Sequence, residues 1–285
     1  MKKIDCFTFF NELDLLEFRL TLLNEYIDHF IIVESNLSHA GKAKPYYFEE
    51  SRDRFAKWEN KITYYPLVQS TEGLVFKERT AHDLDDGSWI LENQQRNAIK
   101  DVAVVNPGDL VFIGDLDEIP DPLTLKKMLS LSQPKALSMR FHYYFMNCRN
   151  MGIEKYWKGT VAVPGEYFNN YSPQYIRDNR NNYKAIENGG WHFSYLGGVE
   201  KIKYKLQSFA HTEYNKEEFL NDDYILLSLQ KGLDILKRPD TKYKIFPLFF
   251  YPYRIRKLMK QYPNFIKNTT VMKWLLGYLR LPFLC

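Results

Sequence analysis

The chain has 285 residues and a mass of 34.0 kDa, which suits one large domain or one domain with a small extension. Its composition, 45% hydrophobic and 26% charged, supports a packed core and excludes a disordered or fibrous protein. The net charge of +4 is unevenly spread: residues 236–285 carry eleven Lys and Arg against one acid, +10 in all, which leaves −6 on residues 1–235. This division argues against nucleic-acid binding, since no basic surface extends over the whole chain.

Predicted strands and helices alternate through the first 130 residues. Apolar residues at Leu13, Leu16, Leu20 and Leu23 lie on one helical face. Ser88 is a plausible N-cap for a second, longer helix. The predicted strands are 4–10, 30–33, 62–65 and 110–113, and the predicted helices are 13–26, 88–105 and 122–131. This order predicts the α/β class, with a mainly parallel, doubly wound sheet.

The second half of the chain is less regular. We expect strands at 136–147 and 160–163, an Asn-rich loop at 169–182, and helices at 199–209 and 216–230. With no repeat and no low-complexity linker, residues 1–235 are predicted to form one α/β domain. Residues 236–285 are then a basic, aromatic and helical C-terminal extension.

The N-terminus and the cysteines predict a cytoplasmic protein. Asp5 interrupts the apolar run after the first lysines, so we interpret this segment as a strand and not a signal peptide. Three widely spaced cysteines, Cys6, Cys148 and Cys285, fit reduced thiols better than a disulfide framework or a zinc cluster. No stretch approaches the roughly 20 apolar residues of a membrane span.

A cluster of carboxylates follows the predicted strand at 110–113, in the sequence Gly-Asp-Leu-Asp-Glu-Ile-Pro. Asp115, Asp117 and Glu118 therefore lie at the carboxyl end of a buried strand, where open α/β sheets bind ligands. Residues two apart in extended backbone point the same way, so we expect Asp115 and Asp117 to converge on a divalent cation, Mn²⁺ or Mg²⁺. The alternative is an exposed acidic turn that caps the helix beginning at Pro122.

Two reaction classes use such a carboxylate pair. In a nucleotide-sugar glycosyltransferase the metal bridges the donor diphosphate, whereas in a phosphohydrolase an aspartate is the nucleophile. Those hydrolases usually carry the motif on their first strand, and here about 110 residues precede it, which favours the transferase. A lectin-like module that binds glycans without turnover is a third alternative.

Paired glycines bracket a Trp-His dipeptide at 189–198. Glycine permits close backbone approach, Trp191 offers a flat face for a sugar ring, and His192 can ligate a metal or move a proton. The alternatives are a core aromatic and a hydrogen-bonded, half-buried histidine. His211 is a weaker candidate ligand.

Six segments resemble glycosyltransferase family 17. They are FNELDLLEFRL from Phe10, DHFIIVES from Asp28, GKAKP from Gly41, ENQQRN from Glu92, GDLDEIP from Gly114 and GWH from Gly190. The resemblance covers about residues 4–235. It implies a GT-A type fold and an inverting transferase that moves a sugar, most simply N-acetylglucosamine from UDP-GlcNAc, to a glycan hydroxyl with a divalent metal.

The resemblance also implies roles for individual residues. Asp115 would face the donor ribose or the metal, and Asp117 and His192 would bind the metal. The nucleotide would be reached by Glu34, Arg96 and Asn97, and the acceptor by Trp191.

The general base is not identified by the sequence. Inversion needs a carboxylate within reach of the acceptor proton. Glu213 and Asp223 are candidates because they follow the Gly-Trp-His segment, and Glu187 is another.

The C-terminal segment 246–285 alternates basic and bulky apolar residues. Its last part, from Trp274 to Leu284, is too short to span a bilayer but suits a helix in the membrane interface. We therefore expect peripheral contact with the inner face of a membrane and a glycan or lipid-linked glycan acceptor. The alternative is that these aromatics pack on the catalytic domain.

Overall fold

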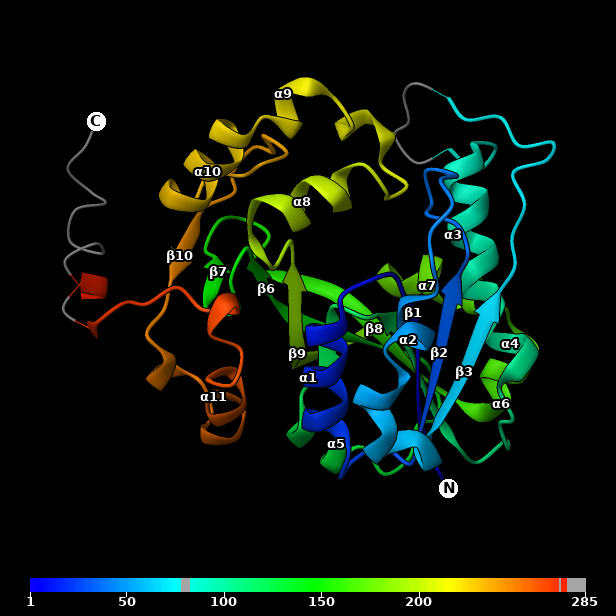
Figure 1. Cartoon of the computed structure of the whole chain (residues 1–285). Coiled ribbons are helices and arrows are strands. Elements are labelled where there is room, and N and C mark those ends of the chain that lie inside the picture. Colours follow the sequence, from blue (N-terminus) through cyan, green and yellow to red (C-terminus); the bar gives the residue numbers. More distant parts are fainter. Residues whose placement is uncertain (78–82, 272, 276–285) are drawn as a thin grey trace.

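A ten-stranded sheet organises the fold (Figure 1). The protein is described by a computed structural model that covers residues 1–77, 83–271 and 273–275. The strands are β1 (Lys3–Phe9), β2 (His29–Ser35), β3 (Ile62–Leu67), β4 (Leu110–Asp115), β5 (Glu118–Pro120), β6 (Lys135–Tyr143), β7 (Cys148–Asn150), β8 (Tyr156–Pro164), β9 (Lys184–Ser194) and β10 (Tyr243–Ile245).

The sheet has a parallel half and a mixed half. Strands β3, β2, β1 and β4 lie side by side and parallel, so their carboxyl ends meet at one edge. Strand β8 is antiparallel to β4, and β6, β7 and β10 continue the order with antiparallel pairings. Strand β9 runs parallel to β6 and also pairs with β5, the short strand that follows the carboxylate cluster.

Helices cover both faces of the parallel half, as Figure 1 shows. The α-helices are α1 (Leu13–Leu23), α2 (Tyr47–Glu50), α3 (Gly87–Asn97), α4 (Ile99–Val102), α5 (Pro122–Lys127), α6 (Gly165–Asn170), α7 (Pro173–Asp178), α8 (Gly198–Leu206), α9 (Glu217–Leu220), α10 (Asp222–Lys231) and α11 (Tyr253–Met259). The 3₁₀ helices are η1 (Arg52–Lys61), η2 (Asn179–Asn181), η3 (Thr212–Tyr214), η4 (Leu248–Phe250) and η5 (Pro263–Phe265).

Side chains of β1 point alternately to the two faces of the sheet, so they contribute to two separate core clusters. Ile4 and Cys6 pack with residues of α4, α6 and α7, whereas Phe7 and Phe9 pack with residues of α1 and α11. A third cluster lies under α8 and α10, where Tyr143 and its neighbours on β6, β7 and β10 are covered. The predicted α/β class is confirmed, and the parallel, doubly wound arrangement holds for β1 to β4.

The structure corrects the predicted helix at 88–105. Its N-cap is Asp86, whose carboxylate accepts a hydrogen bond from Ser88 N at 2.8 Å, and the helix is divided into α3 and α4 at Ala98. The second piece ends at Val102, since valines and then Pro107 follow and neither favours a helix.

Two further predictions were wrong in the second half. The expected loop at 169–182 contains α7, which Ser172 caps and Pro173 begins. The expected helix at 216–230 is two helices, because Asn221 ends α9 and caps α10 through a bond from Tyr224 N at 2.9 Å.

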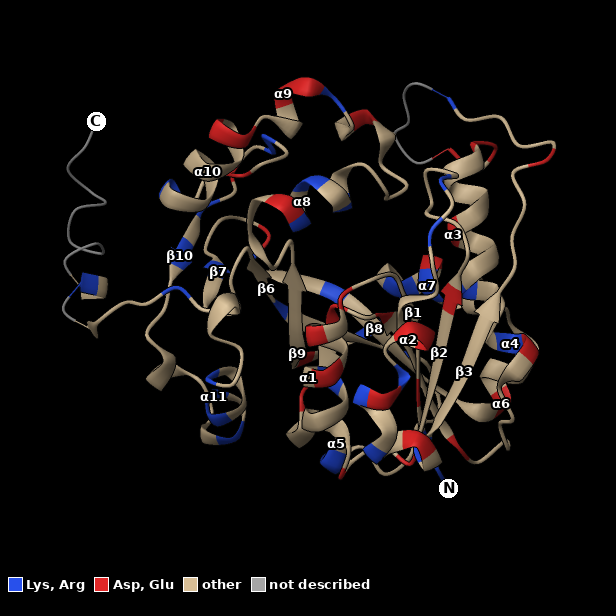
Figure 2. Ribbon diagram, in the orientation of Figure 1, with Lys and Arg blue, Asp and Glu red and all other residues tan. Residues whose placement is uncertain are grey.

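Part of the basic C-terminal segment is built into the main core. Ile255 and Met259 of α11 and Phe265 of η5 are buried against residues of α1 and the sheet. In Figure 2 the ribbons of α11 and β10 carry the blue of Lys and Arg positions. The boundary after residue 235 stays a prediction, and the tail from 276 onward, with Cys285, lies outside the described residues. No helix in the described ranges is long and apolar enough to span a bilayer.

A fully buried arginine on α1 ties the sheet to the carboxylate cluster. Arg19 forms a two-bond pair with Asp5 of β1, at 2.7 and 2.9 Å. Its remaining Nη1 donates to the backbone carbonyls of Asp115, Leu116 and Glu118 at 2.8 to 3.1 Å. One side chain thus fixes the turn that presents the carboxylates.

We expect Arg19→Met to lower the free energy of unfolding by about 3–5 kcal/mol, because Asp5 would remain buried without its counter-charge. Arg54→Met is the control, since Arg54 pairs with Asp14 and Glu17 nearer the surface and should cost less than about 1 kcal/mol. Urea unfolding of both variants measures the difference. Equal losses would contradict the role given to Arg19.

Candidate active site

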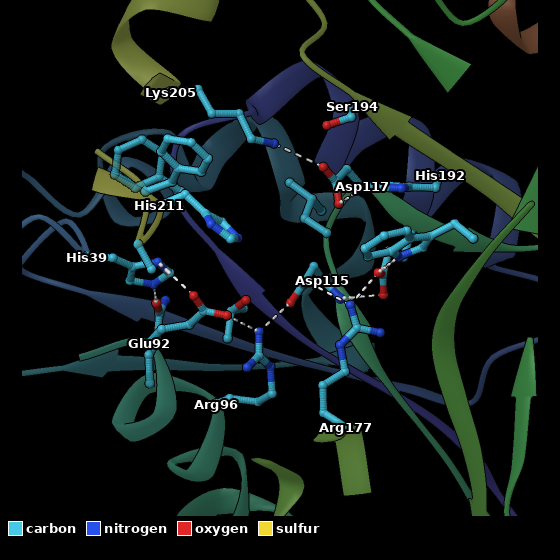
Figure 3. Close-up of a pocket in the computed structure, with 18 of the residues that line it drawn as sticks. His39, Glu92, Arg96, Asp115, Asp117, Arg177, His192, Ser194, Lys205 and His211 are labelled. Atoms are coloured by element: carbon cyan, nitrogen blue, oxygen red, sulfur yellow. Dashed lines mark hydrogen bonds and ion pairs between the residues drawn. The ribbon is translucent and has the colours of Figure 1, made fainter. Parts of the chain in front are cut away.

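A pocket of about 850 Å³ opens at the carboxyl ends of β1 and β4. Its walls come from the ends of these strands, from α3 and α7 on one side and from β9 and α8 on the other. Figure 3 shows the two aspartates near the centre, each facing a different set of basic side chains. Open α/β sheets bind ligands at this edge, so the pocket is the candidate active site.

Asp115, the last residue of β4, lies between two arginines. Its Oδ1 accepts from Arg96 Nη2 and its Oδ2 from Arg177 Nη2, both at 2.9 Å. Burial alone would raise the pKa of Asp115, but the two guanidiniums outweigh it and hold that pKa well below its usual range. The carboxylate is therefore ionised at any ordinary pH.

Glu118 is buried at the floor of the pocket, beside Asp115 and its two arginines. Its Oε1 accepts from Trp157 Nε1 at 2.6 Å and from Arg177, and its Oε2 accepts from the backbone N–H of Asp115 at 3.2 Å. Arg177 thus joins the two carboxylates of the turn. These contacts fix Trp157 in the pocket wall.

Asp117 faces the opposite wall. Its Oδ2 lies 3.0 Å from Lys205 Nζ on α8, and its Oδ1 lies 3.5 Å from His192 Nε2 on β9. Burial opposes ionisation, but Lys205 and then His192 hold the pKa of Asp117 well below its usual range. Asp117 is in a turn and not in a strand, so the two-residue alternation does not apply and the predicted convergence with Asp115 is wrong.

Three predicted ligand-binding residues lie outside the pocket lining. Glu34 is fully buried, where it accepts from Lys44 Nζ at 2.7 Å and from two backbone N–H groups at the start of α2. Asn97 accepts from Gln174 N at 2.9 Å and so holds α7 against α3. Trp191 is a core residue, because alternation along β9 turns it away from the side that His192 occupies.

The candidate bases are widely separated. Oε1 of Glu213 accepts a hydrogen bond from Nδ1 of His211 at 2.8 Å, and His211 lines the pocket. Asp223 is exposed in the first turn of α10. Glu187 is exposed and accepts from Ser138 at 3.1 Å. Of these three carboxylates, Glu213 contacts a pocket residue.

Sequence reasoning named Arg96 and His192 but missed Arg177 and Lys205, the other two basic side chains that face the aspartates. Arg177 fell in the segment expected to be a loop, although Ser172-Pro173 is a helix-start signal that predicts α7. Lys205 is on a correctly predicted helix, but nothing in its local sequence points to Asp117, 88 residues earlier. Trp157 has no local signal either.

Comparison with known proteins assigns the class. The family model of glycosyltransferase family 17 matches residues 1–276, so the chain belongs to glycosyltransferase family 17. The family is one of glycosyltransferases.

Two curated relatives are β-1,4-mannosyl-glycoprotein 4-β-N-acetylglucosaminyltransferases, from Homo sapiens and Rattus norvegicus. Each is 25% identical to this chain over 237 residues, which cover 72% of this chain and 42% of the relative. The chain thus spans less than half the length of these relatives. A solved inositol-1-phosphate CTP transferase from T. maritima aligns over 67% of this chain and 86% of its own, with a TM-score of 0.34 and 10% identity, which does not establish a shared fold.

Proposed function

We propose that this protein is an inverting glycosyltransferase of GT-A type that transfers N-acetylglucosamine from UDP-GlcNAc to a hydroxyl of a glycan. The observation that carries the proposal is the pocket at the carboxyl edge of a parallel sheet, where ionised Asp115 and Asp117 face fixed cations. Family membership supports the reaction class, and the printed activity of the relatives supports the donor sugar.

The donor nucleotide is assigned to the side of the pocket formed by β1 and α3. His39 and Gln95, which hydrogen-bond each other at 2.9 Å, lie there with the aromatic ring of Phe10. The carboxylate of Asp115 is about one-third exposed, so it retains access to a ribose hydroxyl while Arg96 holds it.

The divalent metal predicted from the Asp-x-Asp pattern does not fit this donor set. The four carboxylate oxygens of Asp115 and Asp117 each lie within 3.5 Å of a nitrogen of Arg96, Arg177, His192 or Lys205. Within the described ranges, no group of three or more His, Cys, Asp or Glu side chains is placed to hold a metal. No step of the proposed reaction is therefore assigned to a metal, and the metal role of Asp115, Asp117 and His192 stays a prediction.

Lys205 takes the role of stabilising the leaving diphosphate. Its ammonium group faces the pocket and is held by Asp117, with Glu12 at 3.9 Å. Burial lowers the pKa of Lys205, but the two carboxylates raise it above its usual value, so the group stays charged. A fixed cation beside a developing negative charge lowers the barrier without reorganisation.

His211 and Glu213 are assigned to the acceptor proton. Glu213 holds the Nδ1 side of the ring at 2.8 Å, and the edge-on contact with Trp89, at 4.9 Å between ring centroids, fixes its plane. The Nε2 atom is then available for an acceptor hydroxyl in the pocket. Glu213 thus acts through His211, as an orienting carboxylate.

We expect hydrolysis of UDP-GlcNAc from a panel of UDP-sugars, measured as UDP release, both in EDTA and with Mn²⁺. A folded sample that neither binds nor turns over any nucleotide sugar would contradict the transferase proposal. Turnover that vanishes in EDTA would contradict only the role of Lys205. Release of phosphate from a generic phosphoester would favour the phosphohydrolase, and UDP-independent glycan binding would favour the lectin.

Two substitutions test the paired charges. Lys205→Met should lower kcat by about 10²–10³, since it removes the cation beside the leaving group. Asp117→Asn should lower kcat in the same direction, because it removes the carboxylate that positions Lys205. Asp101→Asn on the exposed side of α4 is the control and should leave kcat unchanged. Circular dichroism checks that all three variants fold, and wild-type rates in the first two would refute both assignments.

We also propose a cytoplasmic location and peripheral membrane contact through 246–285, with a lipid-linked glycan as one acceptor class. The free, buried thiols of Cys6 and Cys148 support the location. Phe249, Phe250 and Tyr253 are exposed beside the basic residues of α11, which supports the contact.

We expect Phe249→Ser with Phe250→Ser to weaken binding to vesicles that contain phosphatidylglycerol, because the rings contribute apolar burial beside basic residues that each add about 1 kcal/mol. Tyr156→Ser, which removes another exposed aromatic, is the control. Sedimentation with vesicles measures both. If the wild-type chain fails to sediment, or the double variant sediments equally well, the membrane contact is excluded.

A further inference from the structure

A half-buried arginine in the pocket wall has no acidic partner. Arg180, in η2, lines the pocket beside Trp157, with its guanidinium carbon 5.5 Å from the ring centroid. Within the described ranges, its one hydrogen bond goes to the backbone carbonyl of Arg177, at 3.3 Å. Among the described residues, no carboxylate lies within ion-pair distance of it.

The neighbouring Arg177 has a hydrogen-bond donor that is not used. Arg177 uses Nη2 for both Asp115 and Glu118, whereas its Nη1 is buried and has no hydrogen-bond partner within the described part of the chain. Its side chain is about 5% exposed, so water does not compensate for the missing bond. A buried guanidinium donor without an acceptor is costly unless a ligand completes it.

The two guanidiniums repel each other across the pocket wall. Burial and then the charge of Arg177 lower the pKa of Arg180, while Glu118 and Asp115 oppose that effect from a distance. Asp115 and Glu118 are already engaged by Arg96, Arg177 and Trp157. An anion placed against Arg180 would relieve this repulsion.

We propose that Arg177 and Arg180 form a subsite for a phosphate-type anion on one of the substrates. The proposal rests on the proposed function, because that function supplies two sources of such a group: the diphosphate of the donor and a phosphate carried by the acceptor. Planar guanidiniums bind phosphate through paired, charge-assisted hydrogen bonds, and Trp157 keeps Arg180 extended along the wall.

The test is binding of inorganic pyrophosphate to the full chain by calorimetry, at fixed ionic strength, with and without saturating UDP. Wild-type protein should bind pyrophosphate, and Arg180→Gln should weaken that binding at least about tenfold. Arg52→Gln is the matched control, because it removes the same charge from an exposed pair with Glu59 outside the pocket. Arg180→Lys should retain part of the affinity.

The effect of UDP identifies the source. Loss of pyrophosphate binding in saturating UDP, together with weaker UDP binding by Arg180→Gln, assigns the subsite to the donor diphosphate. Pyrophosphate binding that persists in UDP and still needs Arg180 assigns it to a phosphate on the acceptor. No binding, or equal binding by wild type and Arg180→Gln, overturns the subsite, whereas failure of UDP to bind counts separately against the proposed function.

Discussion

The buried pair of Arg19 and Asp5 is the constraint on which the site depends. Arg19 joins α1 to β1 and, through three carbonyl contacts, holds the turn from Asp115 to Glu118 in a single shape. Because the interior is apolar around it, the guanidinium is stable only with all of these acceptors in place. The same residue that completes the core therefore fixes the directions in which the pocket carboxylates point.

That fixed turn directs the two aspartates toward different basic side chains. Asp115 points to the arginines of α3 and α7, and Asp117 points to Lys205 and His192. The two carboxylates would repel each other if they converged, but each is instead paired with basic side chains. These basic side chains line the pocket in fixed positions. Such a pocket is suited to a substrate with a diphosphate, and in the proposed reaction side chains of the chain itself stabilise the leaving group.

The sequence predicted much of the fold and part of the site, and the limits have physical causes. Hydrophobic period and turn residues located β1 to β4 and the helix that carries Lys205, because these signals are local. The convergence of Asp115 and Asp117 was mispredicted because a turn replaces the strand after Asp115. Trp191 went into the core because strand alternation allows only one of two neighbours to face the pocket. The contacts of Arg19 and Arg177 join residues about 60 to 100 positions apart, which no local pattern encodes.

The most direct test of the account is a crystal structure of the protein with UDP-GlcNAc, grown in the presence of Mn²⁺. The account predicts the nucleotide in the pocket at the carboxyl edge of β1 and β4, with its diphosphate against Lys205 and the aspartates still paired with their cations. A metal ion bridging Asp115 and Asp117, with Lys205 displaced, would contradict the charge assignment. A nucleotide bound elsewhere, or no nucleotide at all, would contradict the assignment of the site.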